Sequence, residues 1–181
     1  KNCYRSSEAN EVLLMEDAYE LSKMGPFDVA TLPKYLAGKR VSLGFSVNNY
    51  TEMLDGSSTV KDLPTLMELI YTSFTNLTPD YEAYRVQMEK AAAMLADQDK
   101  NPQKIFFEHV NKALYNGNPI MQTPTAATIK ANNMNKTFEL LHAALANPAE
   151  WTFIFTGSVT ADVLKPMLEQ YIASLPVSKV V

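Results

Sequence analysis

The chain has 181 residues, of which 46% are hydrophobic and 20% are charged, with 10 Pro and 6 Gly. This composition excludes disordered and collagen-like classes, and the length is typical of one domain. A folded chain of this size buries roughly 70% of the surface that its unfolded form exposes, so it can build a core without disulfides.

The charge balance is mildly acidic, with 16 Lys+Arg against 20 Asp+Glu and a formal net charge of −4. The densest basic spot, Lys39-Arg40, is too small to neutralise a phosphate backbone, so we expect no nucleic-acid partner. The single cysteine, Cys3, cannot form an intramolecular disulfide. No run of eighteen apolar residues is present, so we expect no membrane span. The chain begins at Lys1 rather than Met and lacks a signal-peptide pattern, so we expect a piece of a longer chain.

Apolar residues at helical spacing predict eight helices. Gly25-Pro26 should end the first of them. The residues from Thr59 to Asp62 resemble a capping box before the third, and Asn101-Pro102 is a cap signal before the fifth. The predicted helices cover residues 7–24, 27–37, 59–74, 81–96, 102–116, 125–131, 135–146 and 160–174.

Three segments have the pattern of strands. Apolar and polar residues alternate over 41–47, Asn48-Asn49 is a turn signal, and 50–55 is expected to return as an antiparallel partner. The third strand is expected at 151–155. This order predicts an α+β fold, a mostly antiparallel sheet with helices packed on one face. Three strands are few for this length, so we expect others in the loops or outside the chain.

The two histidines, His109 and His142, lie on different predicted helices. The sequence from Ile105 to His109 differs in one position from the zinc-binding pattern H-x-x-E-H, but an isoleucine has no lone pair to offer a metal. We expect both histidines to be ordinary helix residues. The alternative is a metal site built from Glu108, His109 and His142, which the spacing does not support.

Other polar groups have simpler interpretations. Asp80 is expected to cap a helix and Asp97-Asp99 to lie in a solvated loop, while Glu16 and Glu20 fit an exposed helix face. No G-x-S-x-G elbow, phosphate loop or C-x-x-C pair is present. We expect loop or turn serines at Ser57, Ser58 and Ser158. The residues alone therefore indicate no catalytic, cofactor-binding or metal-binding side chain.

Taken in order, several segments resemble one part of the pitrilysin/insulinase family of zinc peptidases. The resemblance runs from about Ala9 to Pro176. It is carried by the stretches 36–43, 50–52, 55–58, 61–66, 69–71, 99–102, 114–119, 153–158 and 164–171.

The resemblance implies a mitochondrial-processing-peptidase/insulinase-like α+β module. Proteins of this family repeat the module two or four times and close the copies around a peptide-holding chamber, and usually only the first copy carries zinc. When Gly25 is placed on the glycine after the family's H-x-x-E-H helix, both histidine positions are glutamates, Glu16 and Glu20. The catalytic glutamate is then replaced by Tyr19, and the third-ligand region, near 94–96, offers no ligand.

The resemblance therefore implies that residues 1–181 form a single non-catalytic module, the third of four, in a bacterial zinc metalloendopeptidase. Such a module would hold no zinc itself, since zinc belongs to the catalytic module of the same polypeptide. It would contact that module and a peptide or unfolded protein substrate, in the periplasm or cell envelope. The family's opening strands, missing here, would explain the low strand count. The alternative is a stand-alone inactive homologue that acts as a scaffold or binding subunit.

Overall fold

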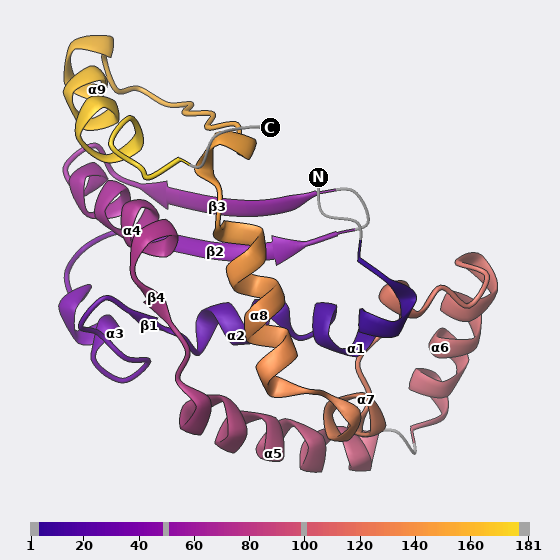
Figure 1. Cartoon of the computed structure of the whole chain (residues 1–181). Helices are drawn as coiled ribbons and strands as arrows, with labels where there is room; N and C mark the ends of the chain where they lie inside the picture. The colour runs from indigo at the N-terminus through magenta and orange to yellow at the C-terminus, as the bar shows by residue number, and fades with distance from the viewer. Residues whose placement is uncertain (1–3, 49–50, 99–100, 178–181) are drawn as a thin grey trace.

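The computed structural model describes residues 4–48, 51–98 and 101–177 (Figure 1). Cys3 and four residues of the patterns above, Asn49, Tyr50, Asp99 and Lys100, lie outside these ranges. The described residues form helices and two small antiparallel sheets, which confirms the α+β prediction. One sheet pairs β1 (Lys23–Met24) with β4 (Leu77–Thr78), and the other pairs β2 (Val41–Val47) with β3 (Glu52–Ser58).

The prediction of one helix over 7–24 was wrong. The segment forms a 3₁₀ turn (Ser6–Glu8) and two short helices, α1 (Ala9–Val12) and α2 (Met15–Glu20). The break between α1 and α2 lets Leu14, which is 2% exposed, enter the core beside Met15. Burial thus outweighs the continuity of the helix. The chain turns at Gly25, as expected, with φ of +60°, a conformation that glycine adopts without a steric penalty.

The second predicted helix, 27–37, is much shorter in the structure, where only one turn forms, α3 (Leu32–Tyr35). The carboxylate of Asp28 accepts hydrogen bonds from the backbone N–H groups of Ala30 and Thr31, at 3.0 and 2.8 Å. Such local bonds give the backbone an alternative to the helix, so the helix begins later than expected.

The strand predicted at 41–47 is β2, and its antiparallel partner runs three residues further than expected, to Ser58. The register places Val41 opposite Ser58 and Phe45 opposite Leu54. Phe45 is 4% exposed and joins the main core cluster. The hairpin therefore contributes one apolar face to the core, as its alternating sequence predicts.

The helix after the hairpin, α4 (Leu63–Thr75), starts four residues later than predicted. Only half of the expected capping box forms: Asp62 N–H donates to Thr59 Oγ1 at 3.2 Å, but the Asp62 carboxylate accepts the Thr59 hydroxyl at 2.7 Å and the Arg40 N–H at 3.0 Å instead of the Thr59 N–H. They close a turn before the helix, and Asp62 becomes the N-cap residue. The buried residues Leu63, Leu66, Met67 and Ile70 of α4 centre a second core cluster.

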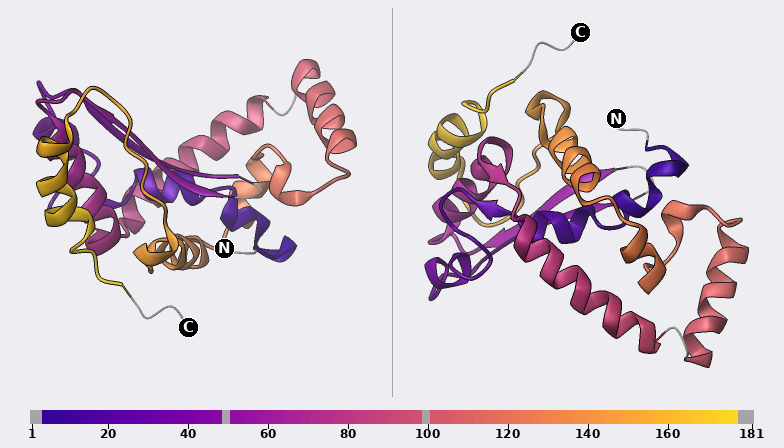
Figure 2. Two further views of the ribbon diagram at one scale, coloured as in Figure 1. Left: turned by 90° about the horizontal axis from the view of Figure 1, so that it is seen from above. Right: turned by 60° about the horizontal axis from the view of Figure 1, so that its bottom comes forward.

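The next four helices lie close to their predicted positions: α5 (Tyr81–Gln98), α6 (Pro102–Leu114), α7 (Ala126–Ala131) and α8 (Met134–Leu145). Side chains of Asn101, Thr125 and Asn133 cap α6, α7 and α8. Figure 2 shows α6 at the end of the molecule opposite α9 (Ala161–Met167). A 3₁₀ turn, Pro119–Met121, follows α6, and another, Pro148–Glu150, follows α8.

The prediction of a strand at 151–155 was wrong, because these residues form no β-strand in the structure. The segment is irregular because it makes no ladder of backbone hydrogen bonds with a second strand, and such a ladder defines a β-strand. The last predicted helix, 160–174, divides into α9 and a π-helical turn (Leu168–Ile172). Pro166 lies inside α9 and lacks the N–H that a continuous helix needs, which accounts for the irregular winding.

Candidate functional site

The position that the resemblance assigns to a zinc-binding helix is α2, which packs beneath the β2–β3 hairpin (Figure 1). Glu16 and Glu20 occupy the two expected ligand positions. Glu16 Oε1 accepts a hydrogen bond of 2.9 Å from the backbone N–H of Val47, at the end of β2. Glu20 is exposed. Glu16 thus has a structural role, joining α2 to the end of the hairpin.

Tyr19, in the position of a catalytic glutamate, is 4% exposed and part of the core. Its hydroxyl shares a hydrogen bond of 2.8 Å with Ser73 Oγ of α4, and its ring stacks on Phe45 of β2 with 5.6 Å between centroids. Burial raises the pKa of Tyr19 to about 12, despite the hydrogen bond from Ser73. A neutral phenol packed in this way cannot act as a general base at neutral pH.

The long helix α5 presents an aromatic residue near α2. Tyr84 is 2% exposed, and its hydroxyl donates to Asn132 Oδ1 at 3.1 Å. Burial raises the pKa of Tyr84, and the nearby charges of Asp17 and Glu11 raise it further. Met94, in the region expected to hold a third ligand, is 65% exposed. Neither residue supplies a carboxylate or an imidazole to this site.

Asp17, on α2, has a raised pKa. Partial burial raises its pKa above the ordinary value, and the neighbouring carboxylates Glu20 and Glu16 add to the rise. A hydrogen bond to the backbone opposes this shift. The cause is desolvation together with like charges, and neither requires a ligand.

The alternative metal site is not assembled by the structure. His109 lies on α6, where its Nδ1 contacts the backbone oxygen of Ile105 at 2.7 Å, and His142 is exposed on α8. Glu108 pairs with Lys104 one turn away on the same helix, at 3.7 Å. Among the residues that the structure describes, no three His, Cys, Asp or Glu side chains are grouped closely enough to hold a metal ion.

The other polar residues considered from the sequence make hydrogen bonds within the fold or line a groove. Asp80 Oδ1 accepts the backbone N–H of Ala83 at 3.1 Å, which confirms its role at the start of α5. The hydroxyls of Ser42 and Ser57 share a hydrogen bond of 2.9 Å across the hairpin. Ser58 and Ser158 both line a groove beside β3.

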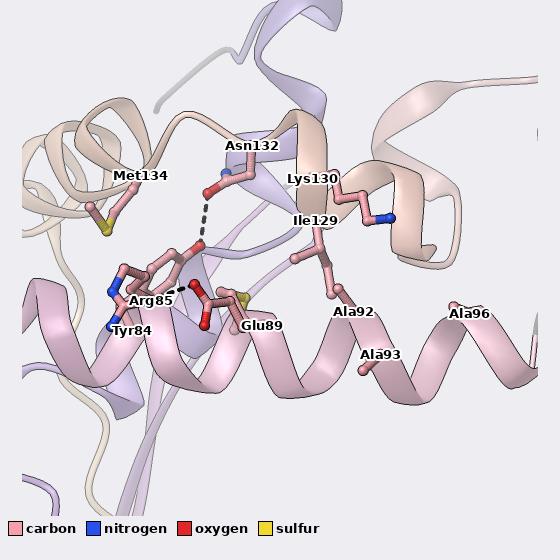
Figure 3. Close-up of a pocket in the computed structure, with 11 residues that line it drawn as sticks. Tyr84, Arg85, Glu89, Ala92, Ala93, Ala96, Ile129, Lys130, Asn132 and Met134 are labelled. Atoms are coloured by element: carbon pink, nitrogen blue, oxygen red, sulfur yellow. Dashed lines mark hydrogen bonds and ion pairs between the residues drawn. The ribbon is translucent and has the colours of Figure 1, made fainter.

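Cavities in the described part of the chain offer further candidate sites. The first, of about 490 Å³, lies between α5 and α7 and has mainly apolar walls, including Met88, Ala92 and Ile129 (Figure 3). On its rim, Arg85 pairs with Glu82 and Glu89, both at 2.7 Å. Arg85 and Glu89, which both line the cavity, are therefore paired with each other.

The second cavity, of about 550 Å³, is the groove between β3 and the segment 151–159. Hydroxyls of Ser57, Ser58 and Ser158 line it, with the apolar side chains of Leu66 and Ile70 beneath. No histidine lines the groove to activate these serines.

Comparison with known proteins identifies relatives along almost the whole chain. A protein of Arabidopsis thaliana described as "Zinc protease PQQL-like" is 22% identical over 180 residues, which cover 96% of this chain and 18% of the relative. The periplasmic protease PqqL of Escherichia coli matches with a TM-score of 0.75 and 18% identity, over 98% of this chain and 19% of PqqL. A mutant of the ferredoxin protease FusC, solved in complex with Arabidopsis ferredoxin, matches with a TM-score of 0.63 and 20% identity, over 94% of this chain and 19% of FusC.

These matches confirm the resemblance to insulinase-like zinc proteases and the fold that it implies. The chain spans about a fifth of the length of each relative. No family model matches the sequence. In the described part of the chain, every helix is too short or too polar to cross a membrane.

Proposed function

We propose that this chain, which is homologous to one segment of insulinase-like zinc proteases, is a non-catalytic module of a zinc metalloendopeptidase. The observation that carries the proposal is the state of α2. The helix stands where the family's zinc-binding helix is expected, yet the residue at its catalytic-glutamate position is the buried Tyr19, held by Ser73 and Phe45. The module contributes part of the peptide-binding chamber and contacts the catalytic module of the same polypeptide, which holds the zinc.

Two features of the relatives support this role. The chain covers about a fifth of each of them, so a polypeptide of their size has room for a catalytic module elsewhere. One structural neighbour, the ferredoxin protease FusC, was solved in complex with ferredoxin. We accordingly propose a peptide or protein as the substrate of the parent enzyme. We place the enzyme in the periplasm or cell envelope of a bacterium, since PqqL is periplasmic.

An immunoblot with an antiserum against the 20.2 kDa chain tests its place in a longer protein. We expect the native antigen to be about five times larger than the chain, in line with the share of the relatives that it covers. An antigen of about the chain's own mass would instead favour the stand-alone scaffold or binding subunit. Hydrolysis of a fluorogenic casein by the chain alone, resistant to further purification, would overturn the non-catalytic assignment.

A further inference from the structure

The helix α6 is amphipathic, and its apolar side chains face solvent. Phe106 is 63% exposed, Phe107 is 65% exposed and Leu114 is 72% exposed, with Val110 between them at 36%. Residues three, four, seven or eight positions apart share one face of a helix, so these four side chains form a continuous surface, which we call the α6 stripe. No residue of α6 is buried. Figure 2 shows the helix at one end of the molecule.

The side of α6 that faces the rest of the chain is polar. Its half-buried residues are Lys104, Glu108 and Asn111, which recur at helical spacing. Lys104 pairs with Glu108 at 3.7 Å, and only 17% of the Lys104 side chain is exposed. Glu108 Oε1 is buried and has no hydrogen-bond partner among the described residues. A helix that covers a core has the reverse arrangement, with apolar side chains inward and charged side chains outward.

The helix α8 shows how a covered helix of this protein is packed. Its apolar residues Phe138, Leu141 and Leu145 follow the same spacing of three and four, and none of them is more than 3% exposed. A helix of 13 residues is marginal in water by itself, and most helical stability in proteins comes from packing of the apolar face. The α6 stripe lacks such packing within the described chain, so we expect a surface from elsewhere to supply it.

The chemistry of the stripe favours a lasting protein interface over a membrane. The rings of Phe106 and Phe107 meet edge to face, with centroids 5.6 Å apart, and aromatic side chains are enriched at protein interfaces. A helix that binds a membrane surface has a polar face rich in Lys and Arg, whereas the polar face of α6 places Glu108 beside Lys104. Permanent interfaces are the most apolar class and resemble a domain core cut in half.

We infer that the α6 stripe is the surface through which this chain packs against the catalytic module of the same polypeptide. The inference rests on the proposed function and deepens it, because that function puts the two modules in contact without naming a surface. The chain spans about a fifth of the length of each relative, so a polypeptide of their size has about four-fifths of its length outside these residues. A module on the same backbone also reaches the stripe at a high effective concentration.

Photo-crosslinking in the longer polypeptide that the proposed function requires tests the inference. The photoreactive analogue p-benzoylphenylalanine replaces Phe107 in one variant and Lys112 in the matched control. Lys112 is exposed on α6 but lies outside the stripe, two positions after Val110. We expect the probe at Phe107 to crosslink, within one polypeptide, to the module that carries H-x-x-E-H, at least tenfold more than the probe at Lys112. Mass spectrometry of the digested protein identifies the crosslinked peptides.

Each other result overturns the inference in a distinguishable way. A crosslink between two polypeptides, seen as a doubled mass on a denaturing gel, would assign the stripe to a second copy. A crosslink that forms only with added casein would assign it to the substrate, and a crosslink to a different module would exclude the catalytic one. Equal or absent crosslinking at the two positions would show that the stripe is not the contact surface. These results leave the non-catalytic role intact, whereas a native antigen of about 20.2 kDa would overturn the proposed function itself.

Discussion

At the scale of single residues, α2 has structural contacts at the positions where the resemblance would place catalytic groups. A zinc ligand must offer a free lone pair, and a general base must lose its proton near neutral pH. Glu16 uses a carboxylate oxygen to accept the N–H of Val47. Tyr19 holds its proton until about pH 12 because it is buried. Glu16 and Tyr19 thus hold α2 against β2 and α4.

We expect Tyr19→Phe to lower the free energy of unfolding by about 1 kcal/mol, because the substitution removes the bond to Ser73 inside the core. Urea unfolding at neutral pH measures the change. Tyr81→Phe is the matched control, since Tyr81 is 46% exposed and should change stability by less than about 0.5 kcal/mol. Equal losses for the two variants would show that the Tyr19–Ser73 bond contributes nothing.

The raised pKa of Asp17 leads us to expect that the stability of the chain depends on pH. Because burial raises its pKa in the folded chain, the unfolded chain releases this proton at lower pH. Stability therefore falls as pH rises from the ordinary aspartate pKa through the raised one, and stays lower above that window. Asp17→Asn should be more stable than the parent chain at pH 7 and similar to it at pH 3. Asp162→Asn, in the first turn of α9, is the control and should not reproduce this pattern. A stability difference independent of pH would contradict the account.

At the scale of elements, the side chains of 151–155 alternate between buried and exposed although the segment is not a strand. Phe153 packs on Phe74 and on the α4 cluster, whereas its neighbour Ile154 points to solvent. We expect Phe153→Ala to cost about 2 kcal/mol, less than for a fully buried phenylalanine. Ile154→Ala should cost under about 0.5 kcal/mol. Thermal unfolding of both variants measures this contrast, and a larger loss for Ile154→Ala would mean that the segment faces the other way.

The start of α8 depends on one side chain. Asn133 Oδ1 accepts the backbone N–H of Lys136 at 3.3 Å, and the Asn133 N–H donates to Glu11 of α1 at 3.1 Å. We expect Asn133→Ala to destabilise the chain by about 1 kcal/mol through loss of the cap. Asn133→Asp keeps an acceptor at the same position and should retain most of the stability. Chemical denaturation of the two variants compares them, and equal losses would show that the cap is unimportant.

Elements that carry their own start and stop signals could be predicted from the sequence. The alternation of 41–47 placed β2, and the cap signal Asn101-Pro102 placed α6. Elements that depend on tertiary packing could not. The break between α1 and α2 serves the burial of Leu14, and a strand at 151–155 requires a partner that the described chain does not supply.

The sequence predicted some residues of the candidate site and missed others. The glycine after the helix, Gly25, was enough to place Glu16, Tyr19 and Glu20 on one short helix. The approach of Tyr84 to Asp17 was missed, because it depends on how α5 crosses the core rather than on spacing along the chain. A tyrosine at helical spacing within a long amphipathic segment was the one signal available, and it is equally typical of any core helix.

At the scale of the whole molecule, a module of about 180 residues preserves a fold while its relatives are five times longer. Its two core clusters meet at α4 and the hairpin, so the chain holds the hairpin, α2 and the 151–155 segment in fixed relation. Under the proposed function, this fixed arrangement would form part of the chamber wall.

The most direct test of the central claim is the zinc content of the carefully dialysed chain, measured by elemental analysis. The account predicts essentially no zinc per chain, because the described residues bring no three metal-binding side chains together and α2 has no histidine. A value near one zinc per chain, abolished by His109→Ala, would contradict it and assign this module a metal site of its own.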